Sequence, residues 1–165
     1  MTDSINYVRI MVDSLRKKSL LLDKIISRND AQRQLIKNAK ELGDVNWDKF
    51  NMTIAEKESV IDQINELDEG FGRLYERVAE ELRNHKEKYR DEIHMMQQLI
   101  SEVTDKGVSI TSGEERNRAD LERVLMSTKK DIRESKKSVR IASDYYKSMS
   151  GLGVASELGF LDTKK

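Results

Sequence analysis

A chain of 165 residues that has no proline and no cysteine, and whose residues are 36% charged but only 5% aromatic, is suited to long helices and poorly suited to β-sheet. Thirty lysines and arginines balance thirty aspartates and glutamates, so we expect neither the basic field of a nucleic-acid-binding protein nor the basic face of a membrane-surface helix. The longest wholly apolar run, Leu20–Leu22, is far too short to insert into a membrane, and the N-terminus lacks a signal-peptide pattern. Together with the absence of cysteine, this predicts a cytoplasmic protein.

The first predicted helix covers residues 3–42. Apolar side chains recur at steps of three and four residues, which places them on one helical face: Ile5, Val8, Val12, Leu15, Leu22 and Ile26. This stripe weakens at Asn29 and Arg33 and returns at Ile36. Gly43 follows as a natural C-cap, because glycine readily adopts the backbone conformation that ends many helices.

The second predicted helix covers residues 46–105 and carries the strongest pattern in the chain. An apolar repeat of period seven runs from Trp47 to Val103, which is typical of a coiled-coil seam. Gly70 and Gly72 interrupt it, and a turn at these glycines is one alternative. Because the repeat keeps its phase across them, we favour a single continuous helix, with a bend at the glycines as a further option.

The third predicted helix covers residues 113–149, after a predicted break at 106–113. Ser112 and Glu115 have the spacing of a capping box, in which each side chain satisfies a free backbone amide of the first turn. A lighter stripe then follows the same four-three rhythm: Leu121, Leu125, Thr128, Ile132, Ser135, Val139, Ala142, Tyr146 and Met149.

These elements predict an all-α fold in which three long antiparallel helices form an elongated coiled-coil-like bundle of residues 1–149, because the connecting loops are short. The first and third helices would then cover opposite ends of the longer second helix. Apolar seam would remain uncovered at each end, and a second copy of the chain or a partner helix would be needed to shield it.

Four polar residues fall on the seam of the second helix: Lys57, Asp68, His85 and Glu92. In one interpretation they lie where no neighbouring helix packs, or extend their charged ends to the edge of the seam. In the other they set the register of the helices or the choice of partner.

No catalytic, cofactor-binding or metal-binding motif is apparent. The chain lacks a phosphate-binding glycine loop and the usual hydrolase and zinc motifs. His85 and His94 are about two and a half helical turns apart, which is too far to share a metal ion. We therefore expect a binding protein without a cofactor and not an enzyme.

Residues 150–165 are predicted to form a flexible tail because they contain Gly151, Gly153 and Gly159. The tail also carries apolar side chains, which a purely solvated segment would lack: Leu152, Val154, Leu158, Phe160 and Leu161. Their presence favours a segment that docks, either on its own bundle or on a partner.

The stretch from Gly43 to Ile64 resembles the flagellar export chaperones of the FlgN type. The similar features are Gly43-Asp44, the Trp47–Phe50 segment, and Lys57 followed by Val60 and Ile61. In that family a short acidic turn precedes a helix with a lysine-centred motif. The layout of helices before and after this stretch, and a tail that contains glycine, agree with the resemblance.

The resemblance implies a cytoplasmic chaperone that binds the C-terminal helical ends of hook–filament junction proteins and delivers them to the flagellar type III export gate. It also implies that a tyrosine near the C-terminus, here Tyr145 or Tyr146, helps to dock at the gate. The alternative is a structural coiled-coil scaffold or tether that assembles through its own seam. We expect a monomer or homodimer, with these candidate partner-binding residues: Ile132, Val139, Tyr145, Tyr146, Met149, Leu152, Leu158, Phe160 and Leu161.

Overall fold

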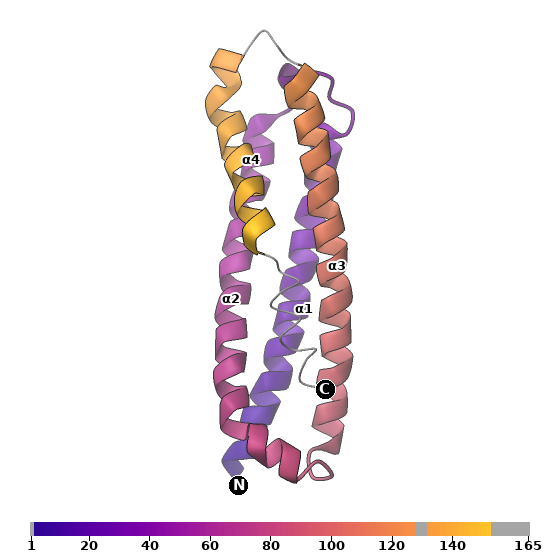
Figure 1. Cartoon of the computed structure of the whole chain (residues 1–165), viewed down its shortest axis with the longest axis vertical. Coiled ribbons are helices and arrows are strands. Elements are labelled where there is room, and N and C mark those ends of the chain that lie inside the picture. Colours follow the sequence, from indigo (N-terminus) through magenta and orange to yellow (C-terminus); the bar gives the residue numbers. More distant parts are fainter. Residues whose placement is uncertain (1, 128–131, 153–165) are drawn as a thin grey trace.

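The computed structural model describes the backbone of residues 2–127 and 132–152, and the side chains of residues 3–126 and 139–149. Within these ranges the elements are the α-helices α1 (Thr2–Ile36), α2 (Trp47–Asn84), α3 (Arg90–Ser127) and α4 (Ile132–Leu152), and a short 3₁₀-helix, η1 (Leu42–Asp44), between α1 and α2. The helices form an elongated bundle in which each runs antiparallel to the one before it (Figure 1). The predicted all-α fold is therefore confirmed.

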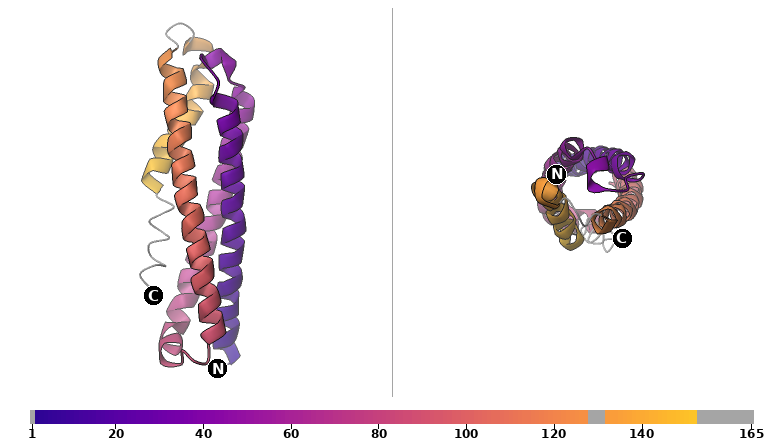
Figure 2. Two further views of the ribbon diagram at one scale, coloured as in Figure 1. Left: turned by 90° about the vertical axis from the view of Figure 1, so that its right-hand side faces the viewer. Right: turned by 90° about the horizontal axis from the view of Figure 1, so that it is seen from above.

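Helix α1 organises the bundle because it packs against both α2 and α3, and α4 packs against α2. Because the chain reverses direction twice between them, α1 and α3 lie parallel to each other (Figure 1). Viewed along the long axis, the helices surround a common centre (Figure 2). Where the structure describes their side chains, most residues of the apolar stripes predicted from the sequence are buried or partly buried.

The predicted second helix, residues 46–105, is wrong in its C-terminal boundary. Helix α2 is continuous through Gly70 and Gly72, as favoured above, but it ends at Asn84. His85 leaves the helical conformation and its backbone N–H still donates to the Glu81 carbonyl. The chain then reverses through residues 85–89 and enters α3 at Arg90.

The seven-residue repeat continues across this reversal, which is why it concealed the turn. Leu82 lies at the end of α2, Tyr89 in the turn and Met96 in α3, and all three are buried in the same apolar cluster. After the turn, the seam of α3 packs against α1, as the seam of α2 does. A constant repeat therefore identifies the buried residues correctly without showing where the chain reverses.

The predicted break at 106–113 is also wrong, because α3 passes through it without interruption. Gly107 and Gly113 are both buried within the helix. A Cβ atom at Gly113 would lie 3.3 Å from Nδ2 of Asn29, so glycine here permits a close approach of α1 and α3. The predicted third helix, residues 113–149, is divided between the C-terminal part of α3 and the whole of α4. The predicted first helix, residues 3–42, ends earlier than expected, at Ile36.

These boundaries change which parts of the seam are covered. Helices α1, α2 and α3 have 35, 38 and 38 residues, and α1 packs against both of the others, so three helices run along nearly the full length of the bundle. The predicted two-helix ends are therefore absent from the part of the chain that the structure describes. Helix α4 has only 21 residues and occupies the upper part of the bundle in Figure 1.

Local interactions stabilise the connection between α1 and α2. The Asp44 carboxylate accepts hydrogen bonds from the backbone N–H groups of Lys40 and Glu41, and these bonds lower the pKa of Asp44. The Asn46 side chain caps α2 by accepting from the Lys49 N–H. Trp47 donates its indole N–H to the Leu42 carbonyl. This connection closes the upper end of the apolar core.

The core divides into three apolar clusters along the bundle. The upper cluster joins η1, the start of α2, the end of α3 and α4, with Phe50 and Ala142 fully buried. The middle cluster joins α1, α2 and α3 around Leu22, Ile25 and Ile110. The lower cluster includes Leu15 and surrounds the turn between α2 and α3. Polar side chains separate the upper and middle clusters at the level of Lys57.

Candidate functional site

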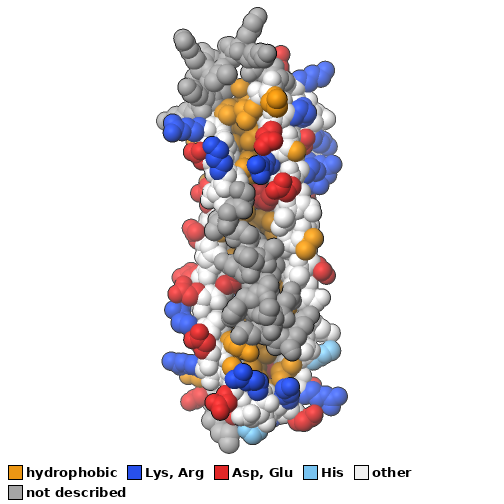
Figure 3. All heavy atoms as spheres, viewed as in Figure 1, with side chains coloured by type: hydrophobic (Ala, Val, Ile, Leu, Met, Phe, Trp, Pro, Cys, Tyr) orange, Lys and Arg blue, Asp and Glu red, His pale blue; other side chains and the backbone are white. Residues whose placement is uncertain are grey.

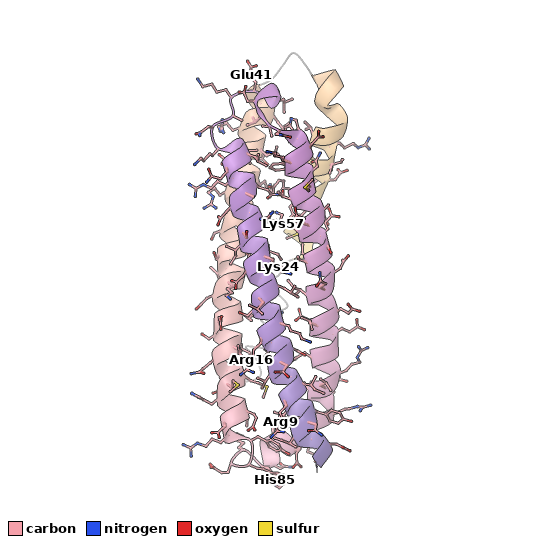
Figure 4. The ribbon with its side chains drawn as sticks, turned by 180° about the vertical axis from the view of Figure 1, so that it is seen from behind. Arg9, Arg16, Lys24, Glu41, Lys57 and His85 are labelled. Atoms are coloured by element: carbon pink, nitrogen blue, oxygen red, sulfur yellow. The ribbon has the colours of Figure 1, made fainter. Side chains whose placement is uncertain are left out.

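The site of greatest chemical interest is a polar cluster in the interior of the bundle, centred on Lys57. This lysine lies on the seam of α2, three residues after the buried Ile54, so its side chain enters the core, where it is 0% exposed (Figure 4). All four helices contribute to the group that we call the Lys57 cluster: Asn29, Gln32, Lys57, Glu114, Asn117, Tyr145 and Tyr146.

The ammonium group of Lys57 uses all three of its donors. Its Nζ atom lies 2.8 Å from Oδ1 of Asn29, 2.8 Å from Oε1 of Gln32 and 2.8 Å from Oε1 of Glu114. A buried charge needs this degree of compensation, because water that would otherwise solvate it is excluded. The lysine thus joins α2 to α1 and α3 at one level of the bundle.

The two tyrosines of α4 complete the cluster from the remaining side. The Tyr145 hydroxyl donates to Oε1 of Glu114 at 2.8 Å, and the Tyr146 hydroxyl donates to Oε1 of Gln32 at 3.3 Å. The Tyr145 ring also lies over the ammonium group, with 4.2 Å between the Lys57 nitrogen and the ring centroid. Helix α4 is therefore bound by specific polar contacts as well as by apolar packing.

Several polar atoms of the cluster have no hydrogen-bond partner among the residues that the structure describes. They are Nδ2 of Asn29, Nε2 of Gln32, Oε2 of Glu114 and Oδ1 of Asn117. A buried polar group without a partner destabilises the folded chain. The cluster is thus a less stable way to fill this volume than apolar packing would be, which favours a role in specificity over a role in stability.

Burial governs the ionisation of this cluster. Desolvation lowers the pKa of Lys57 to about 8, and the nearby Glu114 carboxylate opposes that change without cancelling it. Desolvation, reinforced by Glu114, raises the pKa of Tyr145 and of Tyr146. The tyrosines therefore remain hydroxyl donors at any ordinary pH.

We expect the lowered pKa of Lys57 to make the protein more stable as the pH rises above 8. Between about pH 8 and 10.5 the unfolded chain holds a proton on Lys57 that the folded chain has released, so the free energy of unfolding increases with pH. The increase should reach about 2 kcal/mol at pH 9.5. Urea unfolding of the wild type and of the double variant Lys57→Met/Glu114→Gln, which lacks both groups, checks this. The prediction would be contradicted if the difference in the free energy of unfolding between the wild type and the double variant were the same at pH 7 and pH 9.5.

Further ion pairs join the helices below the Lys57 cluster. The buried Lys18 of α1 pairs with Asp68 of α2 at 2.7 Å. Lys106 of α3 pairs with Asp23 of α1 at 3.0 Å and donates to the hydroxyl oxygen of Ser19 at 2.7 Å. Each pair fits only one axial alignment of the two helices, which supports the register interpretation.

The four seam residues predicted to be polar interruptions have different surroundings. Lys57 and Asp68 both pair with residues of other helices, so they do not lie where a neighbour is missing. His85 is exposed in the turn between α2 and α3, and Glu92 is partly buried in the first turn of α3. The interpretation in which the charge extends to the edge of the seam is therefore wrong for Lys57.

The predicted partner-binding residues lie in several different environments. Tyr145 and Tyr146 are buried, whereas Val139 and Met149 are partly buried against the upper cluster. Ile132 and Leu152 belong to α4, but their side chains are outside those described. The remaining three are outside the described residues: Leu158, Phe160 and Leu161.

Sequence reasoning missed the residues that surround Lys57. Asn29 was identified only as a weak point in an apolar stripe, and Glu114 was given no role. The capping box predicted from the neighbouring Ser112 and Glu115 does not exist, because these residues lie inside α3. Gln32 and Asn117 were not identified. The sequence does show one polar residue on the apolar stripe of each helix, Asn29 on the first and Lys57 on the second. Only the packing of the helices shows that these two side chains contact each other.

Two kinds of candidate site are absent from the described residues. No helix within the described ranges is long and apolar enough to cross a membrane. The same residues contain no group of three or more histidine or carboxylate side chains arranged to hold a metal ion. Comparison with protein-family models, with curated proteins and with solved structures finds no match to this chain.

Proposed function

We propose that this protein is a cytoplasmic chaperone of the flagellar export type, which binds an amphipathic helix of a client protein along the face of the bundle between α2 and α3. The proposal is supported by the resemblance of residues 43–64, which form η1, the start of α2 and the segment that carries Lys57. It is also supported by the incomplete coverage of this face by α4.

The incomplete coverage is the observation that carries the proposal. Helix α4 is about 30 Å long and α2 about 57 Å, at roughly 1.5 Å per residue, so α4 covers about half the length of the face. Below it, Figure 3 shows hydrophobic side chains between α2 and α3 at the lower end of the molecule. Partly buried apolar residues of α2 and α3 pack against the lower cluster: Leu74, Tyr75, Ile93, Leu99 and Ile100.

An amphipathic helix in line with α4 would lie against this apolar end of the face and complete a four-helix arrangement. By the resemblance, the client helix comes from the C-terminal end of a hook–filament junction protein. Docking at the export gate through Tyr145 or Tyr146 would require α4 to separate from the bundle, because both side chains are buried in it.

We expect titration calorimetry of a purified hook–filament junction protein into this chain to show a one-to-one complex. Removal of the C-terminal helical segment of that protein should abolish binding. Ile93→Gln places a polar group in the apolar contact and should weaken binding roughly tenfold or more. Met52→Gln should have no effect, because Met52 is 62% exposed on α2.

Thermal unfolding of both variants separates loss of binding from loss of folding. Undiminished binding of the truncated junction protein would contradict the proposed client segment. Light scattering gives a further check, because a chaperone of this kind should remain a monomer or homodimer before the client is added. Assembly of the isolated chain well beyond a dimer would favour the structural scaffold instead.

A further inference from the structure

The contact between α4 and the rest of the bundle is unusual because its centre is polar. Tyr145 and Tyr146 are each 5% exposed, and both direct their hydroxyl groups to side chains of the Lys57 cluster. Their rings contact each other edge to face, with 5.0 Å between centroids. The other contacts of α4 with the upper cluster, made by Ala142 and by the partly buried Val139 and Met149, are apolar, and most amphipathic helices could make contacts of this kind.

Tyrosine satisfies two different groups at once in this position. The ring of Tyr145 covers the Lys57 ammonium, and its hydroxyl donates to the carboxylate oxygen that Lys57 also contacts. Phenylalanine would keep the contact between ring and cation but leave the buried carboxylate with one donor fewer. Serine would supply a hydroxyl but could not reach across or cover the ammonium group.

A second observation is that hydrogen-bonding groups remain unused at this polar surface. Glu114 and Asn117 each have a buried acceptor atom without a partner among the described residues, and Asn29 and Gln32 each have a buried donor in the same state. The surface therefore offers more hydrogen-bonding groups than α4 uses. A different helix could be held by a different or larger set of these groups.

We propose that Asn29, Gln32, Lys57, Glu114 and Asn117 form a tyrosine-recognition site, and that a partner helix which takes the place of α4 is selected by a tyrosine at this level. This inference rests on the proposed function and deepens it, because it assigns a chemical requirement to the client. A client helix that extends upward along the face between α2 and α3 must displace α4 and present its own tyrosine to Glu114.

The test uses the full chain and a synthetic peptide of residues 132–152 that carries a fluorophore. The receptor is the chain with Tyr145→Phe and Tyr146→Phe, in which its own α4 has lost both hydroxyl donors. We expect the peptide with both tyrosines to bind at least roughly tenfold more tightly than the peptide in which both are phenylalanine, because a hydrogen bond to a buried carboxylate is lost.

Two controls identify the cause of any preference. A peptide with Ile141→Ala should bind like the native peptide, because Ile141 is 45% exposed. A receptor that also carries Lys57→Met and Glu114→Leu lacks both the cation and the acceptor, so its preference for tyrosine should fall below about threefold. Fluorescence anisotropy measures all of these affinities on folded receptors whose helicity has been checked.

Equal affinity of the tyrosine and phenylalanine peptides would overturn the proposed site, since apolar area alone would then decide binding. Failure of the native peptide to bind the receptor would also overturn it, since the α4 position would not accept a second helix. The outcome is separable from the chaperone proposal. Tyrosine selectivity without junction-protein binding would reject only the client class, and the reverse result would reject only the recognition site.

Discussion

The variant Lys57→Met is expected to lose about 3–5 kcal/mol of stability, because it leaves the Glu114 carboxylate buried without its cation. Glu114 would keep only the Tyr145 hydroxyl as a described donor. Lys57 is 0% exposed, so solvent cannot replace the missing charge. Urea unfolding at pH 7 measures the loss.

A double-mutant cycle shows whether this loss belongs to the pair or to one residue. The variant Lys57→Met/Glu114→Gln removes both charges and keeps an acceptor for Tyr145, so it should lose much less stability than the two single variants together. Lys49→Met, on the exposed surface of α2, is the matched control and should change stability by about 0.5 kcal/mol or less. Strict additivity of the two single variants would show that Lys57 and Glu114 are not coupled.

The variant Val108→Pro should lose about 3 kcal/mol or more, because residue 108 lies in the interior of α3. Proline removes one backbone hydrogen bond and clashes with the preceding turn of the helix. Val108 is 60% exposed, so lost side-chain packing contributes little, and Val108→Ala serves as the control for it. Circular dichroism during thermal unfolding measures the effect.

An insertion at the observed turn provides the opposite test. Two residues, Gly-Ser, placed between Lys86 and Glu87 should change stability by less than about 1 kcal/mol, because lengthening an exposed loop carries a small entropic penalty. The same insertion after Val108 would rotate Ile110 and Leu121 away from the core and should unfold much of the bundle. If the insertion after Val108 were tolerated and the one after Lys86 were damaging, the observed turn would be wrong. The predicted helix of residues 46–105, followed by a break at 106–113, would then be favoured.

The docking of α4 connects these predictions with the proposed function. Glu114 of the charge pair also accepts from the Tyr145 hydroxyl, and Gln32, which accepts from Lys57, also accepts from the Tyr146 hydroxyl. Variants of Lys57 and Glu114 should therefore affect both overall stability and the protection of α4. Hydrogen exchange of the amides of α4, compared with those of α1, would separate local release of α4 from global unfolding.

The apolar repeat was sufficient to predict the helical fold and most of the core. Phe50, Ile54, Ile64, Val78 and Val103 were all placed on the seam, and all are buried. Such a repeat identifies a core because it places the apolar side chains on one face of the helix, which packs against neighbouring helices. It also correctly indicated that α2 continues through Gly70 and Gly72.

The same repeat could not show where the chain reverses. The buried Tyr89 stands seven residues after Leu82 and seven before Met96, although it lies in the turn between two helices. The polar residues of the turn resemble those on the solvent face of any charged helix. Conversely, Gly107 and Gly113 looked like a break but lie buried in α3, where Gly113 packs closely against Asn29.

The sequence by itself determined that this protein is helical, that its helices bury one stripe each, and that a lysine interrupts the stripe of α2. Only the tertiary structure decided what that lysine contacts. Asn29, Glu114 and Tyr145 are separated from Lys57 by 28, 57 and 88 positions, and no local pattern relates them. The physical reason is that helical periodicity is a local property, whereas the partners of a buried charge depend on how the helices are connected and aligned.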